Sequence, residues 1–429
     1  MSKRLPPTLR AYRLFSRVAR PVAPLALAAR ARRGKEPSGR IAERRGVAAM
    51  PRPPGPVVWI HGASVGELMS VLPLIERIIA RDVNVLVTSG TVTSGDLAAQ
   101  RLPAGVIHQF APLDVPAYVR RFFDHWQPDL ALFVESDLWP NRIIEASTRR
   151  VPMILINGRL SEKSYQRWRR LPAAITDLLH RFDLCLARTP ADAERLSALG
   201  APRLLTAGNL KLDVPAPPCD ERQLARLKQV IGERPLVAAA STHEGEEAAM
   251  VEAHRRLASK FPGLMTVIAP RHPDRGPAIA EEVAATGLTA RLRSRGERPD
   301  KACDIYIADT LGELGLIYRL APVVFIGGSL IRHGGQNPIE AAKLGTAIVH
   351  GPHVWNFAEV YGALDEARGA EIVADESRLT GVLGMLLAHP EARERAATNA
   401  YNTMRGLGGA LERTLSALEP YLLQLRLER

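Results

Sequence analysis

The segment His61–Glu67 places a histidine, a serine, two glycines and a glutamate directly after the apolar run Val57–Ile60. This order predicts a strand, a glycine-rich turn and a helix over Leu68–Ala80. N–H groups at a helix start attract anions. Three residues are therefore candidates for binding an anionic substrate group: His61, Ser64 and Gly66. Glu67 is a candidate general base, because a carboxylate there can take a proton from an attacking hydroxyl. The alternative interpretation is a first-turn acid that stabilises the helix dipole.

A second glycine-rich segment, Gly327–Glu340, follows the predicted strand Val323–Ile326 and leads into a helix predicted to begin at Pro338. Glycines allow close approach to a ligand, and the N–H groups of such a loop can hold phosphate oxygens. Asn337 and Glu340 also match a capping box, which needs no ligand. Glu340 could instead accept hydrogen bonds from a ribose diol, and the sequence leaves these alternatives open.

Two further segments of the second half are candidates for ligand contacts. Arg271 follows the strand Met265–Ile268, where its planar guanidinium suits a phosphate or a carboxylate. The alternative is a surface arginine in a turn between two prolines. In Asp309–Leu314, Thr310 lies near a predicted helix start, and main-chain groups there could contact a base or a sugar.

The first half carries acids at a strand end. Glu135 and Asp137 follow the apolar strand Leu130–Val134, where buried carboxylates are unusual unless paired or functional. Lys211 closes the last strand of this half and could neutralise one of them, or a substrate anion. His243 and His333 lack metal-ligand spacing, and each is interpreted as a hydrogen-bonding loop residue. The acid-rich segment Thr242–Glu247 is interpreted as a helix cap.

Short β-rich runs alternate with helical patterns from residue 56 onward, which predicts parallel sheets with helices on both faces. The first series of strands is Val57–Ile60, Asn84–Thr88, Val106–Phe110, Leu130–Val134, Met153–Ile156, Leu184–Ala187 and Leu204–Ala207. A proline-rich stretch at 213–218 then predicts a linker. The second series is Leu236–Ala240, Met265–Ala269, Leu288–Ala290, Ile305–Ile307, Val323–Ile326, Ala347–His350 and Glu371–Val373. The fold class is thus α/β, with two tandem domains whose ligand-binding strand ends are expected to face a central cleft.

The net charge of +12 over 429 residues is confined to the N-terminus. Residues 1–52 hold 14 Lys/Arg and two acids, so residues 53–429 sum to neutral. Apolar side chains interleaved with these arginines predict an arm lying on an anionic membrane surface. A disordered basic tail, nucleic-acid contact or targeting are the alternatives, and the apolar stretch Pro21–Ala29 is too short to span a bilayer. Three dispersed cysteines favour a reducing cytoplasm and no disulfide framework or metal site.

The chain resembles the family of 3-deoxy-D-manno-octulosonic acid (Kdo) transferases of lipopolysaccharide biosynthesis, in ordered motifs over nearly its whole length. These motifs are His61–Glu67, Glu135–Asn141, Asn157–Ser161, Gly208–Lys211, Ser241–Glu247, Ala269–Pro273, Gly312–Leu314 and His333–Glu340. The resemblance implies a GT-B glycosyltransferase with two Rossmann-like domains. It also implies an inverting, metal-independent enzyme without cofactors that uses CMP-Kdo as donor and lipid IVA as acceptor, at the cytoplasmic face of the inner membrane.

The resemblance also implies roles for individual residues. Glu67 matches the catalytic base, and Glu135 and Lys211 match a further active-site pair. The residues that match donor contacts are Pro270, Arg271, Gly312, Glu313, Leu314, Asn337, Pro338, Ile339 and Glu340.

The domains expected are a membrane-associating arm (1–52), an acceptor domain (53–213), a linker (214–219), a donor domain (220–405) and a C-terminal helix (406–429). Whether this helix packs back on the acceptor domain is left open by the sequence pattern. Rival functions are another GT-B transferase acting with a UDP-sugar, or a nucleotide-sugar epimerase. A nucleic-acid-binding protein is disfavoured, because the body of the chain is neutral.

Overall fold

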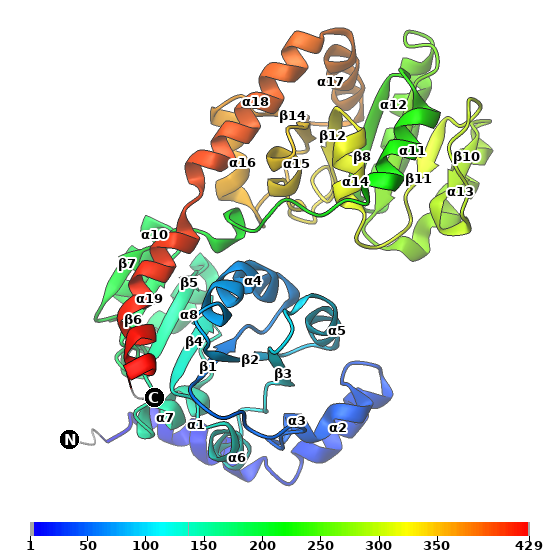
Figure 1. Ribbon diagram of the computed structural model, residues 1–429. Coiled ribbons are helices and arrows are strands. Elements are labelled where there is room, and N and C mark those ends of the chain that lie inside the picture. Colours follow the sequence, from blue (N-terminus) through cyan, green and yellow to red (C-terminus); the bar gives the residue numbers. More distant parts are fainter. Residues whose placement is uncertain (1–3, 136, 428–429) are drawn as a thin grey trace. The chain divides into compact units, whose positions relative to one another are not determined.

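The computed structural model describes residues 4–135 and 137–427, and these residues form two compact units (Figure 1). The N-terminal unit comprises Met1–Val214 together with Gly408–Arg429, and the C-terminal unit comprises Pro215–Leu407. Each unit is built on one seven-stranded sheet in which all the pairs of neighbouring strands are parallel. The predicted α/β class is confirmed.

The sheet of the N-terminal unit has the order β3-β2-β1-β4-β5-β6-β7. Its strands are β1 Val57–His61, β2 Asn84–Ser89, β3 Ile107–Phe110, β4 Leu130–Val134, β5 Met153–Gly158, β6 Leu184–Ala187 and β7 Leu204–Thr206. All seven predicted strands are confirmed to within two residues at either end. The helices that connect them are α4 Val65–Ile79, α5 Val92–Arg101, α6 Pro116–Trp126, α7 Pro140–Thr148, α8 Glu162–Arg169, α9 Pro172–Leu179 and α10 Pro190–Ala198, followed by the 3₁₀ helix η2 Leu210–Leu212.

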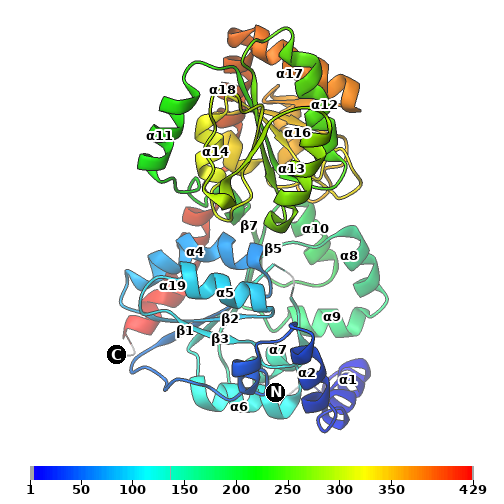
Figure 2. The same ribbon diagram turned by 90° about the vertical axis from the view of Figure 1, so that its right-hand side faces the viewer.

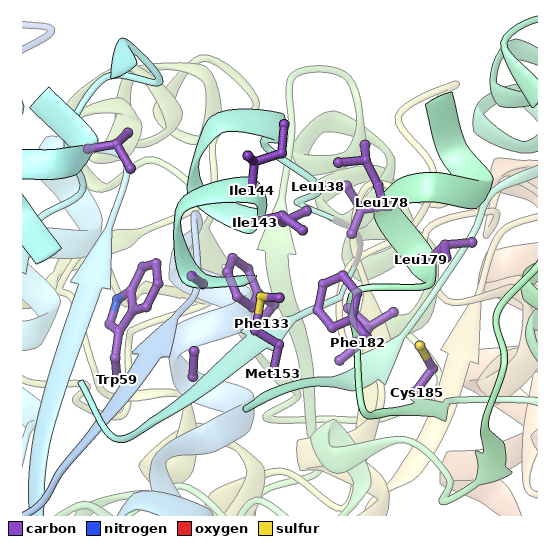
Figure 3. Packing of buried hydrophobic residues seen from close by; sticks show 14 of the residues in the cluster. Trp59, Phe133, Leu138, Ile143, Ile144, Met153, Leu178, Leu179, Phe182 and Cys185 are labelled. Atoms are coloured by element: carbon purple, nitrogen blue, oxygen red, sulfur yellow. The ribbon is translucent and has the colours of Figure 1, made fainter. Parts of the chain in front are cut away.

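Strands buried on both faces explain the continuous apolar runs in the sequence. On one face, Trp59 and Phe133 meet edge to face with ring centroids 5.2 Å apart, and side chains of α6, α7 and α9 cover them. Figure 3 shows this packing around Phe133, Met153 and Phe182. The opposite face is covered by α4, α5 and the C-terminal helix α19 (Ala410–Leu427), as Figure 2 also shows.

Helix α19 belongs to the N-terminal unit although it ends the chain. Its apolar side chains, including Leu418 and Leu422, enter the same core as α4. At the surface, Arg77 of α4 pairs with Glu412 at 2.9 Å, and Arg81, just after α4, pairs with Glu419 at 2.8 Å. The chain therefore passes between the units twice, at residues 214–215 and 407–408.

The basic N-terminal segment is folded onto the N-terminal unit and is not a detached arm. It forms α1 Pro7–Val18, α2 Ala23–Arg32, the 3₁₀ helix η1 Ser38–Arg40 and α3 Ile41–Arg44. Leu9 and Leu27 are buried, and the Tyr12 hydroxyl donates to Asp114 Oδ2 at 2.9 Å. Other apolar side chains of the segment stay exposed, namely Leu14, Phe15, Val18, Val22 and Leu25. Among the described residues, no helix is both long and apolar enough to cross a membrane.

The sheet of the C-terminal unit has the order β10-β11-β9-β8-β12-β13-β14. Its strands are β8 Leu236–Thr242, β9 Met265–Pro270, β10 Ala290–Leu292, β11 Ile305–Ile307, β12 Val323–Ile326, β13 Ala347–His350 and β14 Ala370–Ile372. The third strand begins two residues later than predicted, at an edge of the sheet where only one neighbour fixes its register. The remaining elements are α11 Glu221–Ile231, α12 Glu246–Ala258, η3 Pro273–Arg275, α13 Gly276–Ala285, η4 Arg293–Arg295, α14 Leu314–Leu320, α15 Ile339–Lys343, α16 Ala358–Glu366, α17 Glu376–Ala388 and α18 Pro390–Leu407.

Candidate active site

The strand order of each sheet identifies where a ligand binds. In the N-terminal unit β1 lies between β2 and β4, and in the C-terminal unit β8 lies between β9 and β12. At both places the chain reverses the direction in which it adds strands, and the loops leaving the carboxyl ends diverge there. Parallel α/β sheets bind ligands at these switch points. His61 ends β1 and Gly62–Glu67 follows it, whereas Thr242 ends β8 and His243–Glu247 follows it.

Helix α4 begins three residues earlier than predicted, at Val65, because Ser64 caps it. The Ser64 Oγ accepts a hydrogen bond from the Glu67 N–H at 3.3 Å. The Glu67 carboxylate turns back toward the cap and accepts from Ala63 N–H at 2.7 Å and from Ser64 Oγ at 2.8 Å. Glu67 is thus a first-turn acid whose position is held by two hydrogen bonds. These capping contacts do not by themselves show whether Glu67 can act as a base, because that depends on the pKa that its surroundings impose.

Those surroundings make Glu67 a weak acid. Burial raises the pKa of the Glu67 carboxyl to about 7, against the opposing effect of the Ser64 hydrogen bond. The carboxylates of Glu135 and, to a smaller degree, Asp137 add to the rise in pKa. A carboxylate with a pKa near the working pH is well suited to general base catalysis.

Glu135 and Lys211 form an ion pair, with Lys211 Nζ 2.8 Å from Glu135 Oε1. Gly66 lies beside them, because a Cβ added there would be 3.9 Å from Lys211 Nζ. The structure therefore brings Gly66, Glu67 and the pair together, although they come from three separate segments. Ser64 joins the group through its hydrogen bond to Glu67.

Two residues at these strand ends have backbone angles that ordinary side chains disfavour. Glu135 follows β4 with φ 59°, and Asn157 lies near the end of β5 with φ 51°. The Asn157 Oδ1 accepts from Leu210 N–H at 3.1 Å, which holds the turn that presents Lys211. Left-handed non-glycine residues persist where the surroundings enforce them, often at functional sites.

His61 lies beneath this group, which corrects its interpretation as an anion-binding residue. Its side chain is 1% exposed. Nδ1 lies 2.9 Å from Thr88 Oγ1, and Nε2 lies 3.0 Å from Asp137 Oδ2 and 2.6 Å from Arg142 Nη1. Burial and the Arg142 guanidinium lower the pKa of His61. His61 therefore supports the loop that carries Asp137 and does not face a ligand.

A buried network of polar side chains lies behind His61 and was not predicted from the sequence. The Asp114 carboxylate accepts hydrogen bonds from the Asn141 and Arg142 N–H groups at 3.0 and 3.1 Å, which caps α7 from outside its own segment. Tyr12 of α1 donates to the same carboxylate. Arg142 is 5% exposed although it lies in a polar helical pattern. In this region the sequence indicated only Asp137, as an acid at a strand end, and the motif Glu135–Asn141.

A largely apolar pocket of about 350 Å³ adjoins Asp137. It is lined by Thr8, Leu9, Tyr12, Asp137, Leu138, Trp139, Pro140, Arg167, Trp168, Leu171 and Ala174. Helix α1 forms one wall, so the N-terminal segment contributes directly to a cavity that includes Asp137, one of the carboxylates that act on the charge of Glu67.

In the C-terminal unit, the glycine-rich loop after β12 does not offer its first N–H groups to a phosphate, which corrects the sequence-based prediction. The buried Glu246 carboxylate accepts from Gly328, Ser329 and Leu330 N–H at 2.7, 3.0 and 3.0 Å. It also accepts from His243 N–H at 3.0 Å. An internal carboxylate thus holds the loop in place of an external anion.

The helix after this loop also differs from prediction. Helix α15 begins at Ile339, and Pro338 is its N-cap residue without a side-chain cap. Asn337 Oδ1 accepts from Ile339 N–H at 3.0 Å, and Asn337 Nδ2 donates to Glu340 Oε1 at 3.3 Å. The reciprocal bonds of a capping box are replaced by this side-chain pair. Burial raises the pKa of Glu340.

The other residues matched to donor contacts lie at the same sheet edge. Pro270 ends β9, and the exposed Arg271 follows it, anchored by its N–H to Thr242 O at 2.9 Å. Gly312 takes a φ of 81° before Glu313, the residue that precedes α14 at Leu314. Glu313 pairs with Arg293 and accepts from the Thr310 hydroxyl, beside a pocket of about 520 Å³. Within the described residues, no group of three or more His, Cys, Asp or Glu side chains could hold a metal ion.

The chain is similar to known proteins over most of its length. The sequence model described as 3-deoxy-D-manno-octulosonic-acid transferase (kdotransferase) matches residues 39–214. The 3-deoxy-D-manno-octulosonic acid transferase of Haemophilus influenzae is 33% identical over 89% of this chain and 91% of its own. The protein of the same name from Bordetella pertussis is 35% identical over 88% and 90%.

Two solved structures with TM-scores above 0.5 share the fold, and a third covers only part of this chain. The UDP-GlcNAc 2-epimerase of Neisseria meningitidis bound to UDP-GlcNAc is 15% identical, with a TM-score of 0.57 over 86% of this chain and 99% of that chain. The glycotransferase of kitacinnamycin is 17% identical, with a TM-score of 0.53 over 86% and 100%. The C-terminal CMP-Kdo binding domain of WaaA from Acinetobacter baumannii is 32% identical, covering 43% of this chain and 97% of that domain, with a TM-score of 0.42.

The paired parallel sheets define a protein with the GT-B fold, shared by glycosyltransferases and nucleotide-sugar epimerases. Identity above 30% over nine-tenths of the length narrows the class further. The chain belongs to the family of 3-deoxy-D-manno-octulosonic acid transferases. It is therefore a glycosyltransferase of lipopolysaccharide biosynthesis.

Proposed function

We propose that this enzyme transfers Kdo from CMP-Kdo to lipid IVA with inversion at the anomeric carbon, and that Glu67 is the general base. The observation that carries the proposal is the Glu67 carboxyl itself. Its pKa is raised to about 7, it is fixed by hydrogen bonds from Ala63 and Ser64, and it adjoins the switch point of the N-terminal sheet. At neutral pH about half of such carboxyls are ionised and ready to take a proton.

In the proposed step, Glu67 takes the proton of a glucosamine 6-hydroxyl as that oxygen attacks the anomeric carbon of Kdo. The new carbon–oxygen bond forms on the face opposite the phosphate. The bond between the anomeric carbon and the phosphate oxygen breaks, and its electron pair leaves with CMP. Lys211, paired to Glu135 at 2.8 Å, supplies a fixed positive charge near the reacting groups.

On the donor side, Arg271 is the proposed partner of the phosphate. Its side chain is exposed at the carboxyl end of β9, and within residues 4–135 and 137–427 no carboxylate pairs with it. We assign nucleotide contacts to Pro270, to the Gly312–Leu314 segment and to Asn337–Glu340. These segments follow β9, β11 and β12, whose carboxyl ends lie on one edge of the sheet. Charge that grows on the departing phosphate is offset by the guanidinium, so the proposed step needs no metal ion.

For the acceptor, a lipid fits the surroundings of the Glu67 group. The exposed apolar side chains of α1 and α2 lie among arginines, a combination that binds anionic membrane surfaces. The apolar pocket beside Asp137 gives an acyl chain a place to lie near the proposed base. We therefore place the enzyme on the cytoplasmic face of the inner membrane.

The test is incubation of the purified enzyme with lipid IVA and CMP-Kdo generated in situ, followed by mass spectrometry of the lipid. Wild type should add whole Kdo units. Glu67→Gln should lower turnover by about 10³-fold or more, the range expected for loss of a general base together with its charge. Glu76→Gln, an exposed glutamate on the same helix, is the matched control. Near-normal turnover by Glu67→Gln would contradict the assignment of Glu67 as the base. Transfer of a different sugar would contradict the assignment of CMP-Kdo as the donor.

A further inference from the structure

Three histidines meet at the switch point of the C-terminal sheet. His243 follows β8, His272 follows β9 and His333 lies in the loop after β12, so each comes from one of three adjacent strands. The rings of His243 and His333 lie 3.9 Å apart between centroids, and those of His243 and His272 lie 6.1 Å apart. Each was interpreted from the sequence as a separate loop residue or left without a role. Their convergence is a property of the fold.

The backbone around the histidines is built to hold them there. Ser241 takes a φ of 57°, at an irregularity in the pairing of β8 with β9 just before His243. The His243 N–H is fixed by Glu246, and its Nε2 lies 3.0 Å from Gln336 Nε2. His333 lies over Gly328, where an added Cβ would be 3.4 Å from its Cδ2. A strained backbone and close packing of this kind are typical of functional sites, where the surrounding structure holds side chains in fixed positions.

The cluster is positively biased. Arg271 and Arg275 lie close enough to His243 to act on its charge, and so do His272 and His333. Arg275 is paired with Glu244 and Glu247 at 3.6 and 3.3 Å. Glu246, whose carboxylate binds the His243 N–H, is occupied by four N–H groups. Burial, then the neighbouring histidines and arginines, lowers the pKa of His243 to about 4. An anion placed here would relieve this repulsion and accept hydrogen bonds from the rings.

The proposed donor carries two anionic groups side by side, and each needs its own hydrogen-bonding or cationic partner. Kdo is an acid sugar whose carboxyl group is attached to the anomeric carbon, the same carbon that bears the phosphate. The first N–H groups of the glycine-rich loop cannot meet a second anion, because Glu246 occupies them. The Arg271 guanidinium lies close enough to His243 to act on its charge, so a carboxylate next to a phosphate held by Arg271 would lie beside the histidine cluster.

We propose that His243, His272 and His333 form a carboxylate subsite that recognises the acid group of the donor sugar. The inference rests on the proposed function and adds a selectivity device to it. Neutral nucleotide sugars lack the carboxylate and would leave the cluster without its anion. The subsite therefore separates an acid sugar from the neutral sugars that other enzymes of this fold use.

The test compares two constants in one assay, the KM for CMP-Kdo and the inhibition constant of CMP. CMP carries the phosphate without the sugar acid. His272→Gln and His333→Gln change exposed side chains, and His243→Gln removes the central ring. Each should raise the KM for CMP-Kdo about tenfold, the scale of one hydrogen bond to a charged group. The inhibition constant of CMP should change by less than about twofold on the same scale. His389→Gln, an exposed histidine of the same unit, is the control and should change neither constant.

Equal increases in both constants would overturn the proposal, since the cluster would then hold the nucleotide phosphate. An unchanged KM in both His272→Gln and His333→Gln would also overturn it. A second arm does not depend on turnover. Imidazole ¹H–¹⁵N spectra of the full chain with CMP should shift on addition of free Kdo but not of Kdo reduced to the C1 alcohol. If the wild type transfers no Kdo, the proposed function is wrong. The spectra then test by themselves whether the histidines bind the carboxylate, and identical spectra with both sugars would reject the subsite.

Discussion

Lys211 Nζ and Glu135 Oε1 are 2.8 Å apart, which joins two strand ends separated by 76 residues. The pair lies beside Gly66 in the first turn of α4, and Glu135 also acts on the charge of Glu67. A lysine ammonium, a paired carboxylate and a weakly acidic carboxyl thus share one edge of the sheet. The charge of Glu135 contributes to the raised pKa of Glu67, and this makes the proposed mechanism testable through pH.

Wild-type kcat/KM should fall on the acid side with a midpoint near pH 7. The pKa of Glu67 is raised to about 7, and only the ionised carboxylate can accept the proton of the acceptor hydroxyl. The measurement is the initial rate of Kdo transfer between pH 5 and 9 at low substrate concentrations. A flat profile through pH 5 would show that no group with this pKa controls the reaction.

Glu135→Gln should move this acid limb to lower pH. The negative charge of Glu135 opposes ionisation of Glu67, so its removal lowers the pKa of Glu67. The same substitution leaves the Lys211 ammonium without its partner, and we expect a lower maximal rate as well. The position of the limb is independent of that maximum. Glu76→Gln should leave the limb where it is in the wild type, whereas a shift to higher pH in Glu135→Gln would contradict the electrostatic argument.

The strands could be predicted from the sequence because strands buried on both faces consist of consecutive apolar residues. Leu130–Val134 and Ile305–Ile307 have the predicted bounds, and both are interior strands. The edge strand β10 was displaced, since a three-residue run with one neighbour contains little information about register. Position relative to strand ends was enough to select Glu67 and Lys211 as candidates.

What the sequence could not provide were contacts between distant polar residues. Tyr12 and Asp114 are 102 residues apart, so a tail rich in arginine gave no sign that it docks on the core. Glu246 looked like a helix-capping acid, yet its carboxylate binds a loop more than 80 residues away. The three histidines likewise become a cluster only when adjacent strands bring their loops together.

Glu67→Gln should raise the free energy of unfolding at pH 8 and change that free energy little at pH 5. The folded-state pKa of Glu67 is raised to about 7 from an ordinary 4.5. Its contribution to stability is therefore fully present below about pH 4.5 and is lost as the pH rises through 7. Gln keeps a neutral group at every pH, so the variant should gain on the order of 1 to 3 kcal/mol at pH 8. Urea unfolding of both proteins at the two pH values measures it, and equal stabilities at pH 8 would contradict the raised pKa.

Serine at Leu14, Phe15 and Val18 should release the enzyme from anionic vesicles while the fold persists. These side chains are 61 to 74% exposed on α1, so their loss removes membrane contact without opening the core. Deletion of residues 1–50 would be a poorer test, because Leu9, Leu27 and Glu43 are buried within that segment. Cosedimentation with phosphatidylglycerol vesicles measures binding, and an unchanged thermal midpoint shows that folding is intact. Continued cosedimentation of the triple variant would assign membrane binding to another surface.

Glu246→Gln should disorganise the donor side of the enzyme. The buried carboxylate accepts hydrogen bonds from Gly328, Ser329, Leu330 and His243 N–H groups. The glutamine side chain has one amide oxygen, which is a weaker acceptor than a carboxylate, and an NH₂ group, which cannot accept a hydrogen bond. We expect a loss of roughly 2 to 4 kcal/mol in unfolding free energy, as for buried charged hydrogen bonds left without a partner. CMP binding should weaken along with it, because the loop leads into Asn337 and Glu340. Glu244→Gln, whose side chain is 91% exposed, is the matched control. Urea unfolding and calorimetric titration with CMP measure both effects, and a Glu246→Gln variant as stable as Glu244→Gln would show that the loop holds its shape without the carboxylate.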